Sequence, residues 1–159
     1  MTIPLEEVEG YIKDMGYIIA TPRTVEPSYY KLKDGTIIKA LIHVNYAILS
    51  SGPVPDTPHF AINSTNNIAV YVPKDKRSPT PFQPFNTSDL QSAVIDDDME
   101  PEPLRENFSV YDLSNGTVLS VKTIVGQIGK TKFYTRDGEP VYHANMTPIV
   151  KTTKQPRHL

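Results

Sequence analysis

Two stretches of the chain resemble each other in register, and this internal similarity limits the folds that the chain can adopt. Residues 30–40 read YKLKDGTIIKA and residues 111–121 read YDLSNGTVLSV, so that Tyr30 aligns with Tyr111. Further along, PHFAINST at 58–65 matches PVYHANMT at 140–147, and the separation of these two stretches is almost the same. Self-similarity at a fixed spacing indicates a repeated structural unit. We therefore predict two units, residues 28–73 and 109–153, against the alternative of two unrelated hairpins that share common turn residues.

Turn residues and β-branched runs indicate that each unit is made of strands. Asp-Gly and Asn-Gly pairs are typical of two-residue hairpins of type I′, because both central positions need a positive φ angle. The predicted turn residues are Asp34, Gly35, Asn115, Gly116, Asp137 and Gly138. Runs rich in Ile, Val and Leu follow the first two of these turns, as expected of strands.

The run after each of the first two turns is long, so we expect it to bend near Asn45 or Gly126. Two short strands should follow in each unit, at 60–63 with 68–72 and at 132–135 with 141–144. A unit of this size is marginally stable alone, so the two should share one core. The predicted fold is mainly β, with two internal repeats packed as one pseudo-symmetric small barrel or sandwich.

Outside the repeats, the sequence predicts one N-terminal helix and a short second one. Thr2 is positioned to cap a helix over 4–15, and Gly16 to end it. One face of that helix is apolar: Leu5, Val8, Ile12 and Met15. Ser88 and Gln91 fit a capping box for a short helix in the connector. We thus divide the remaining chain into a helix and lead-in (1–27), a proline-rich acidic connector (74–108) and a basic tail (154–159).

Composition excludes several classes of function. There is no Cys among the 159 residues, which rules out disulfides, thiolate nucleophiles and Cys-ligated metals. The net charge of −2 is not the bulk charge of a nucleic-acid binder. The N-terminal segment lacks the features of a signal peptide, and the apolar stretches are too short to span a bilayer. We expect a cytoplasmic protein with no membrane association.

Several short motifs resemble functional sites without meeting their requirements. Residues 126–131, GQIGKT, lack the first glycine of a phosphate-binding loop and precede a strand instead of a helix. The acidic run 96–102 lacks EF-hand spacing, and we interpret it as a solvated segment or a contact for a basic partner. Five N-glycosylation sequons have no secretion signal to accompany them. The histidines show no metal-ligand spacing. We therefore assign no catalytic, cofactor-binding or metal-ligating residue.

These observations do not determine the function, and three hypotheses remain. The first is a non-catalytic binding or assembly module that uses exposed strand edges for homo-oligomers or a protein partner. The second is a nucleic-acid-binding small barrel that uses the basic C-terminal half. The contact residues that we predict for a ligand or partner are Lys130, Lys132, Tyr134, Arg136, Tyr142 and His143. The third is an enzyme of unknown class, with a cleft formed by Asp34, His43, His59 and His143.

Overall fold

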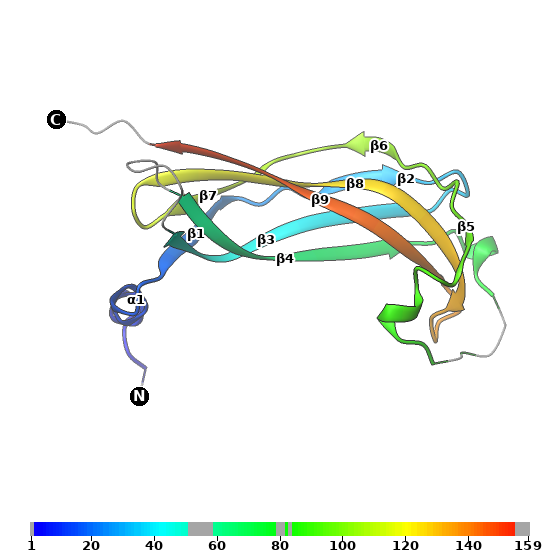
Figure 1. Ribbon diagram of the computed structural model, residues 1–159, viewed down its shortest axis with the longest axis horizontal. Coiled ribbons are helices and arrows are strands. Elements are labelled where there is room, and N and C mark those ends of the chain that lie inside the picture. The colour runs from blue at the N-terminus through cyan, green and yellow to red at the C-terminus, as the bar shows by residue number, and fades with distance from the viewer. Residues whose placement is uncertain (1, 51–58, 79–81, 83, 155–159) are drawn as a thin grey trace.

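The computed structural model describes residues 2–50, 59–78, 82 and 84–154, and these residues form a mainly β structure with one α-helix (Figure 1). The helix, α1, spans Leu5–Asp14. The strands of the described chain are β1 (Ile18–Thr24), β2 (Ser28–Lys31), β3 (Ile37–Ser50), β4 (His59–Tyr71), β5 (Val94–Asp96), β6 (Glu102–Arg105), β7 (Ser109–Leu113), β8 (Thr117–Tyr134) and β9 (Pro140–Lys154). All the strand pairings among them are antiparallel.

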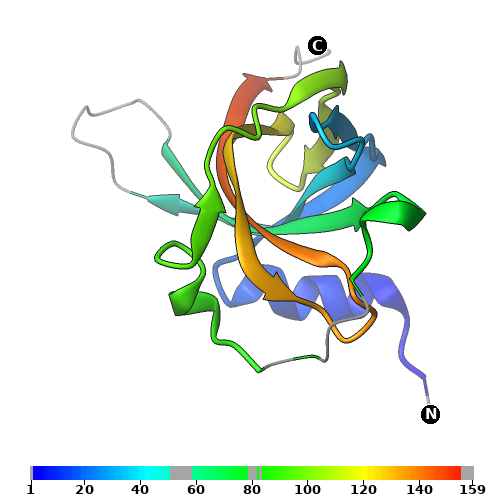
Figure 2. The same cartoon turned by 90° about the vertical axis from the view of Figure 1, so that its right-hand side faces the viewer.

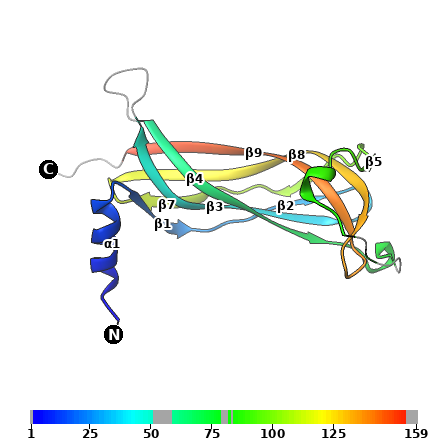
Figure 3. The same cartoon turned by 60° about the horizontal axis from the view of Figure 1, so that its bottom comes forward.

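Six of these strands belong to two meanders. Strands β2, β3 and β4 form the first meander, and β7, β8 and β9 form the second. The long hairpins β3–β4 and β8–β9 run along the length of the molecule (Figures 1 and 3). The two short strands expected at 60–63 and 68–72 are one continuous strand, β4, and the one expected at 132–135 is the end of β8. The polar residues between the expected strands do not interrupt β4, because most of that strand is exposed.

Both long hairpins are irregular at the positions where a bend is expected. The register of β3 against β4 shifts between Val44 and Tyr46, and the register of β8 against β9 shifts between Val125 and Ile128. These β-bulges confirm the bends near Asn45 and Gly126, since an extra residue on one strand kinks the pair.

The predicted turns are present, but they are of a different type. The N–H of Gly35 donates to Leu32 O, and the N–H of Leu32 donates to Thr36 O. This pattern defines a three-residue loop with a glycine bulge instead of a two-residue type I′ turn. Gly35, Gly116 and Gly138 have φ angles of +91°, +89° and +80°. The residues beside them, Asp34 and Asn115, accept hydrogen bonds from backbone N–H groups two positions on.

Two strands outside the meanders, β1 and β6, pair with strands of the meanders. β1 pairs with β3 through Ile18 and Ile19 and then with β7, while β6 precedes β7 in the chain but pairs with β2. β4 pairs only with β3 and β9 only with β8 in the described chain. The sheet is therefore not closed into a barrel, and that part of the prediction is wrong because the long hairpins end as free edges. Seen along its length, the molecule curls around its core without a closed ring (Figure 2).

The core consists of two clusters, and each contains residues from both meanders. The first cluster is Ile18, Ile42, Val44, Ala47, Tyr111, Leu113, Leu119 and Val121. The second is Tyr30, Leu32, Ile38, Ala40, Met99, Val125 and Ile128. Since neither meander supplies a whole cluster, both cores depend on the meanders being packed together.

The predicted N-terminal helix is confirmed, but not its cap. Pro4 occupies the N-cap position without a side-chain hydrogen bond, so Thr2 does not cap the helix. Gly16, with a φ angle of +95°, lies just after the helix, as expected of a terminating glycine. The apolar face is not buried: Leu5 and Met15 are 69% and 72% exposed.

The connector contains short elements in place of the second helix that we expected. Two 3₁₀ turns span Lys74–Lys76 and Thr87–Asp89, and no side-chain cap is formed at the second. Ser88 lies inside that turn and does not cap it, because the chain turns into strand β5 within a few residues. The connector is held to the second meander by backbone bonds, Ser78 N to Gly138 O at 2.7 Å and Lys132 N to Ala93 O at 3.0 Å.

Candidate functional site

A cavity of about 410 Å³ lies beside the bulge of β8. Its lining comes from two segments: Val125, Gly126, Gln127 and Ile128 of β8, and Asp97, Asp98, Glu100 and Pro101 of the chain between β5 and β6. Val125 and Ile128 are core residues that are 4% and 0% exposed. Asp97, Asp98 and Glu100 are exposed. The cavity therefore has exposed carboxylates at its rim and a half-buried proline, Pro101, while the two core residues beneath it present almost no accessible surface.

A second cavity of about 210 Å³ adjoins the first, since Asp97 and Gln127 line both. It is also lined by Gln91, Val94, Gly129, His143 and Asn145. The structure thus places one of the predicted contact residues, His143, at the candidate site. The amide and imidazole groups here add hydrogen-bonding capacity beside the acidic rim.

Glycine residues of β8 shape both cavities. A Cβ atom at Gly129 would lie 2.8 Å from Cγ1 of Val94, so only glycine lets β5 approach β8 this closely. At Gly126 a Cβ would meet only the backbone oxygen of Asn145, at 3.5 Å. A side chain therefore fits at Gly126, and its absence leaves the space beside the bulge open.

Aromatic and amide side chains pack around the bulge of β3, whereas a cavity lies beside the bulge of β8. The rings of Tyr17 and Tyr46 meet edge to face there, with centroids 4.9 Å apart. The side chain of Asn45 donates hydrogen bonds to Asn63 at 2.8 Å and Thr65 at 3.0 Å. These aromatic and amide groups occupy the surroundings of the β3 bulge.

Asp96, which adjoins the rim carboxylates in the chain, has charged and backbone partners of its own. Asp96 accepts a hydrogen bond from the backbone N–H of Asp98 at 3.0 Å and pairs with Lys33 at 3.0 Å, and both interactions lower the pKa of its carboxyl group. The ion pairs within the described part of the chain are Arg23–Asp112, Lys33–Asp96 and Lys122–Glu106. None of these ion pairs includes a carboxylate that lines the larger cavity. Asp98 also interacts electrostatically with Lys33, so the three carboxylates of the larger cavity outnumber the one lysine beside them and leave a net negative charge.

Tyr142, predicted as a ligand contact, is engaged inside the protein. Its hydroxyl donates to Asp34 at 2.6 Å and lies 3.2 Å from the hydroxyl of Thr36. Burial and the hydrogen bond to Asp34 raise the pKa of Tyr142. Burial opposes ionisation of Asp34, but the bonds from Tyr142 and Thr36 together with the charge of Lys130 lower its pKa. The hydroxyl of Tyr142 thus ties β9 to the first turn, and its side chain is half-buried.

The remaining predicted contacts lie near the far end of the second meander. Lys130 is opposite Tyr142 in the β8–β9 register, and Tyr134 ends β8. Arg136 lies 5.2 Å from the ring of Phe82, and Lys132 lies 5.5 Å from the ring of Phe133. The structure therefore places Lys130, Tyr142 and His143 at neighbouring positions of the β8–β9 pair, and Lys132, Tyr134 and Arg136 toward the turn that joins the two strands.

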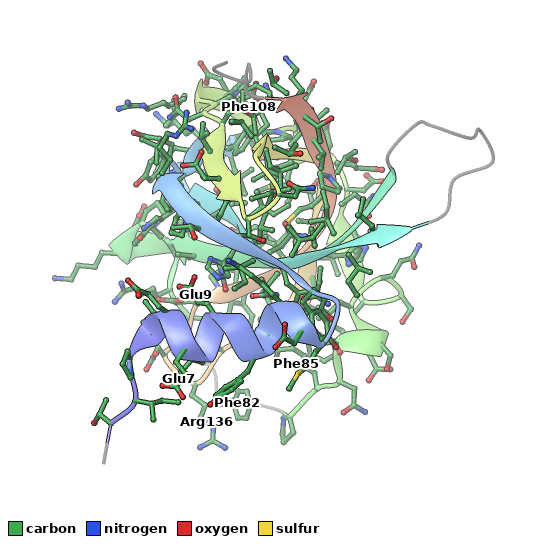
Figure 4. The ribbon with its side chains drawn as sticks, turned by 90° about the vertical axis from the view of Figure 1, so that its left-hand side faces the viewer. Glu7, Glu9, Phe82, Phe85, Phe108 and Arg136 are labelled. Carbon is green, nitrogen blue, oxygen red and sulfur yellow. The ribbon has the colours of Figure 1, made fainter. Side chains whose placement is uncertain are left out.

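Sequence reasoning missed a cationic cluster at Phe108. Lys122 and Lys151 lie 4.7 Å and 4.8 Å from the centre of its ring. In Figure 4, Phe108 is at the top of the view, and Phe82, Phe85 and Arg136 are at the bottom. The two lysines are far apart in the sequence, so only the β8–β9 register could have brought them together.

The residues of the enzyme hypothesis occupy different surroundings. His43 lies 3.4 Å from the hydroxyl of Tyr111, Asp34 bonds to Tyr142, and His143 lines the smaller cavity. The side chain of His59, together with Pro58, His158 and the tail residues 155–159, lies outside the described residues. Among the side chains that are described, no three His, Asp or Glu residues form a group that could hold a metal ion.

Comparison of the chain with protein-family models, with curated proteins and with solved structures gives no match. None of the helices in the described ranges has the length and apolar character needed to cross a membrane. The function must therefore be argued from the site and the fold themselves.

Proposed function

We propose that the chain is a non-catalytic binding module made of two copies of one β unit, and that the second copy binds a small organic cation in the cavity beside the β8 bulge. The register of the two meanders supports the duplication. Val44 pairs with Ser64 in the first, and Val125 pairs with Met146 in the second. The two sequence matches align Val44 with Val125 and Ser64 with Met146. The bulges then follow at the same point of each hairpin.

The crossing strands support a repeat that begins before residues 28 and 109. Pro22 of β1 pairs with Tyr111, and Pro103 of β6 pairs with Tyr30. The alignment of Tyr30 with Tyr111 also aligns Pro22 with Pro103. The two cross-strand pairs are therefore equivalent: in each, the proline of one copy pairs with the tyrosine of the other. Each copy thus adds its leading strand to the meander of the other copy.

Two buried serines make the same exchanged contact. The hydroxyl of Ser109 accepts a hydrogen bond from the N–H of Glu26 at 3.0 Å, and the hydroxyl of Ser28 accepts one from the N–H of Asn107 at 3.1 Å. Such reciprocity is the property of a two-fold interface, in which residue i contacts j and j contacts i. The contacts are those of a homodimer joined into one chain.

Two buried tyrosines follow the same rule. The hydroxyl of Tyr111 accepts from the N–H of Val44 at 3.3 Å, and the hydroxyl of Tyr30 accepts from the N–H of Val125 at 3.4 Å. The core also supports the duplication, because the same alignment pairs every residue of the second cluster with a residue of the first. In the first cluster, Ile42 corresponds to the buried Thr123.

The observation that carries the binding proposal is a difference between the copies. In the same alignment, Tyr17, Asn45 and Tyr46 of the filled bulge correspond to Asp98, Gly126 and Gln127 of the open one. Protein interiors are close-packed, and an unfilled space loses contacts on every side. A unit that can fill this space in one copy has no packing reason to leave it open in the other.

The lining indicates the class of ligand. Asp97, Asp98 and Glu100 favour a positive charge, while Pro101 and the small accessible part of Val125 favour a short apolar body. Primary amines and guanidinium groups with a few methylene carbons have both features. Such a group can donate hydrogen bonds to the carboxylates and place its methylene carbons against Pro101.

The experiment compares three ligands with the same carbon skeleton: n-butylamine, n-butanol and butyrate. Each is titrated into the isotope-labelled full chain while amide shifts are followed by NMR. We expect the amine to perturb Gln127 and its neighbours most, n-butanol less, and butyrate not at all. A response that does not depend on the charge of the ligand contradicts the proposal.

A filled variant supplies the matched control. Gln127→Tyr with Asp98→Tyr gives the second copy the residues that close the first. We expect this double variant to fold and to lose the amine response. Glu6→Gln removes an exposed carboxylate on α1 and should leave the response unchanged. Retained binding in the filled variant would place the amine elsewhere and overturn this site.

Phe108 between Lys122 and Lys151 favours a second candidate, a single-stranded nucleic-acid contact. Lysines bind phosphates, and a partly exposed ring can stack on a base. The test is binding of a fluorescent single-stranded oligonucleotide at low salt by the full chain and by Lys151→Ala. Affinity that falls with salt and with the substitution supports this function, and absence of binding at low salt removes it.

A further inference from the structure

Strands β4 and β9 are the free edges of the two long hairpins, and they differ in how they are protected. Each pairs with one neighbour only in the described chain. β4 lies along the lower side of the sheet in Figure 1. A free edge presents unpaired backbone N–H and C=O groups, which another strand can use unless the edge carries charges, prolines or bulges.

β9 carries such protection. Pro148 lies in the middle of the strand, opposite Thr123, and Lys151 follows on the same strand. A proline has no N–H, and an exposed lysine would have to be desolvated for another strand to pair there. This edge therefore resists addition of a strand.

β4 has neither kind of protection. Residues 61–71 read AINSTNNIAVY, with no charged residue and no proline. When PHFAINST is aligned with PVYHANMT, Asn66 and Ala69 stand at the positions of Pro148 and Lys151. Except for Ile62, residues 61–68 are exposed.

Pro148 also indicates which way the backbone of Asn66 points. Within a sheet, proline is tolerated on an edge strand where the missing N–H would face away from the neighbour. Asn66 pairs with Ile42 as Pro148 pairs with Thr123, at the same register. The N–H of Asn66 therefore faces the open side of β4, where it can donate to an added strand.

We infer that β4 is the dimer interface of this protein and pairs antiparallel with β4 of a second copy. Self-pairing of the 61–71 segment brings no like charges together. Self-pairing of β9 would bury Lys151 and would lose a hydrogen bond at Pro148, which has no N–H. A two-fold axis through Asn66 places Ile62 of one copy beside Val70 of the other, and β-branched cross-strand pairs of this kind stabilise sheets. This inference rests on the proposed duplication and not on the ligand cavity.

The test measures the oligomeric state of the full chain by sedimentation velocity over a range of concentrations. We expect a dimer whose dissociation constant rises about tenfold or more in Asn66→Pro, because the outward donor is lost, and in Asn67→Lys, because a charge enters the edge. Asn66→Ala is the matched control. It loses the same side-chain bond to Thr123 but keeps the backbone N–H, so it should remain a dimer.

Hydrogen exchange identifies the strand within the intact protein. Amides of 61–71 should exchange more slowly at high protein concentration than at low, while amides of 140–154 should not change. A wild-type monomer at all concentrations overturns the inference and leaves the cavity proposal standing. A dimer that persists in both edge variants, with a thermal transition like that of the wild type, also overturns it by placing the interface elsewhere.

Discussion

The two halves of the molecule, taken as residues 17–71 and 97–153, make matching buried contacts and differ at their surfaces. In the first half, aromatic rings pack at the bulge, and the edge strand β4 has no charged residue and no proline between residues 61 and 71. In the second half, the bulge opens into a cavity and the edge strand carries Pro148 and Lys151. Under the proposed duplication, the contacts that hold the halves together were retained, and the exposed bulges and edges were free to change.

The matching contacts lie in the core, where residues of both halves pack against each other. Tyr30 belongs to a cluster with Met99 and Val125, and Tyr111 belongs to one with Ile18 and Val44. Neither ring can be buried by its own half alone. The comparison therefore predicts matched energetic effects in the core and unmatched effects at the surface.

The largest effect is expected from Tyr30→Ala and Tyr111→Ala. The two rings are 1% and 0% exposed, so each truncation should cost about 3–5 kcal/mol of unfolding free energy, by analogy with other buried aromatic residues. Urea denaturation measures both, and the two losses should be of similar size. Tyr71→Ala is the control, because that side chain is 52% exposed. A large loss at one site with a small loss at the other would contradict the equivalence of the halves.

The next effect is expected from Ser28→Ala and Ser109→Ala. Each substitution leaves a backbone N–H, of Asn107 or of Glu26, without its acceptor, at a cost of about 1–3 kcal/mol. Equal losses by urea denaturation sharpen the comparison. Ser92→Ala, whose exposed hydroxyl bonds to Asp89 nearby in sequence, should change stability little. Unequal losses from the two buried serines would mean that the exchanged bonds are not equivalent in energy.

Elements that depend on local sequence signals could be predicted, and strands that depend on contacts with the other half could not. The turns, the bulges near Asn45 and Gly126, and the N-terminal helix follow from local signals, so sequence-based prediction finds them. β1 and β6 were missed because Pro22 and Pro103 lower the local strand signal, and only pairing with the other half makes these segments strands.

The candidate site was harder to predict than the fold. Asp97 and Asp98 were visible as part of an acidic run, and His143 as a contact, but the cavity depends on what is missing at Gly126. Absence of a side chain gives no chemical signal in the sequence. Comparing the two halves position by position gives one, since Asn45 then aligns with Gly126 and Tyr46 with Gln127.

A smaller effect is expected from Gly35→Ala and Gly116→Ala. Both glycines have φ angles in the left-handed region, +91° and +89°, which costs other residues about 1–2 kcal/mol. A Cβ at Gly35 would also lie 3.3 Å from Pro73, whereas a Cβ at Gly116 meets nothing within 4 Å. We therefore expect Gly35→Ala to be slightly more destabilising in urea. Gly10→Ala in α1 meets no neighbour and should stabilise the protein slightly; loss of stability there would question the helix.

The smallest effect is expected in the pH dependence of thermal stability, because the first turn carries a charge and the second does not. Asp34 and Asn115 accept the same backbone bond, but only Asp34 ionises, and its pKa is lowered in the folded protein. A lowered pKa adds stability above the ordinary value of about 3.9, and this stability is lost as the pH falls through the folded value. Asp34→Asn should therefore lose less thermal stability than the wild type between about pH 6 and about pH 2.5. Tyr142→Phe removes a bond that lowers this pKa and should flatten the same profile. Parallel pH profiles for wild type and Asp34→Asn would show that the charge at the first turn does not distinguish the halves.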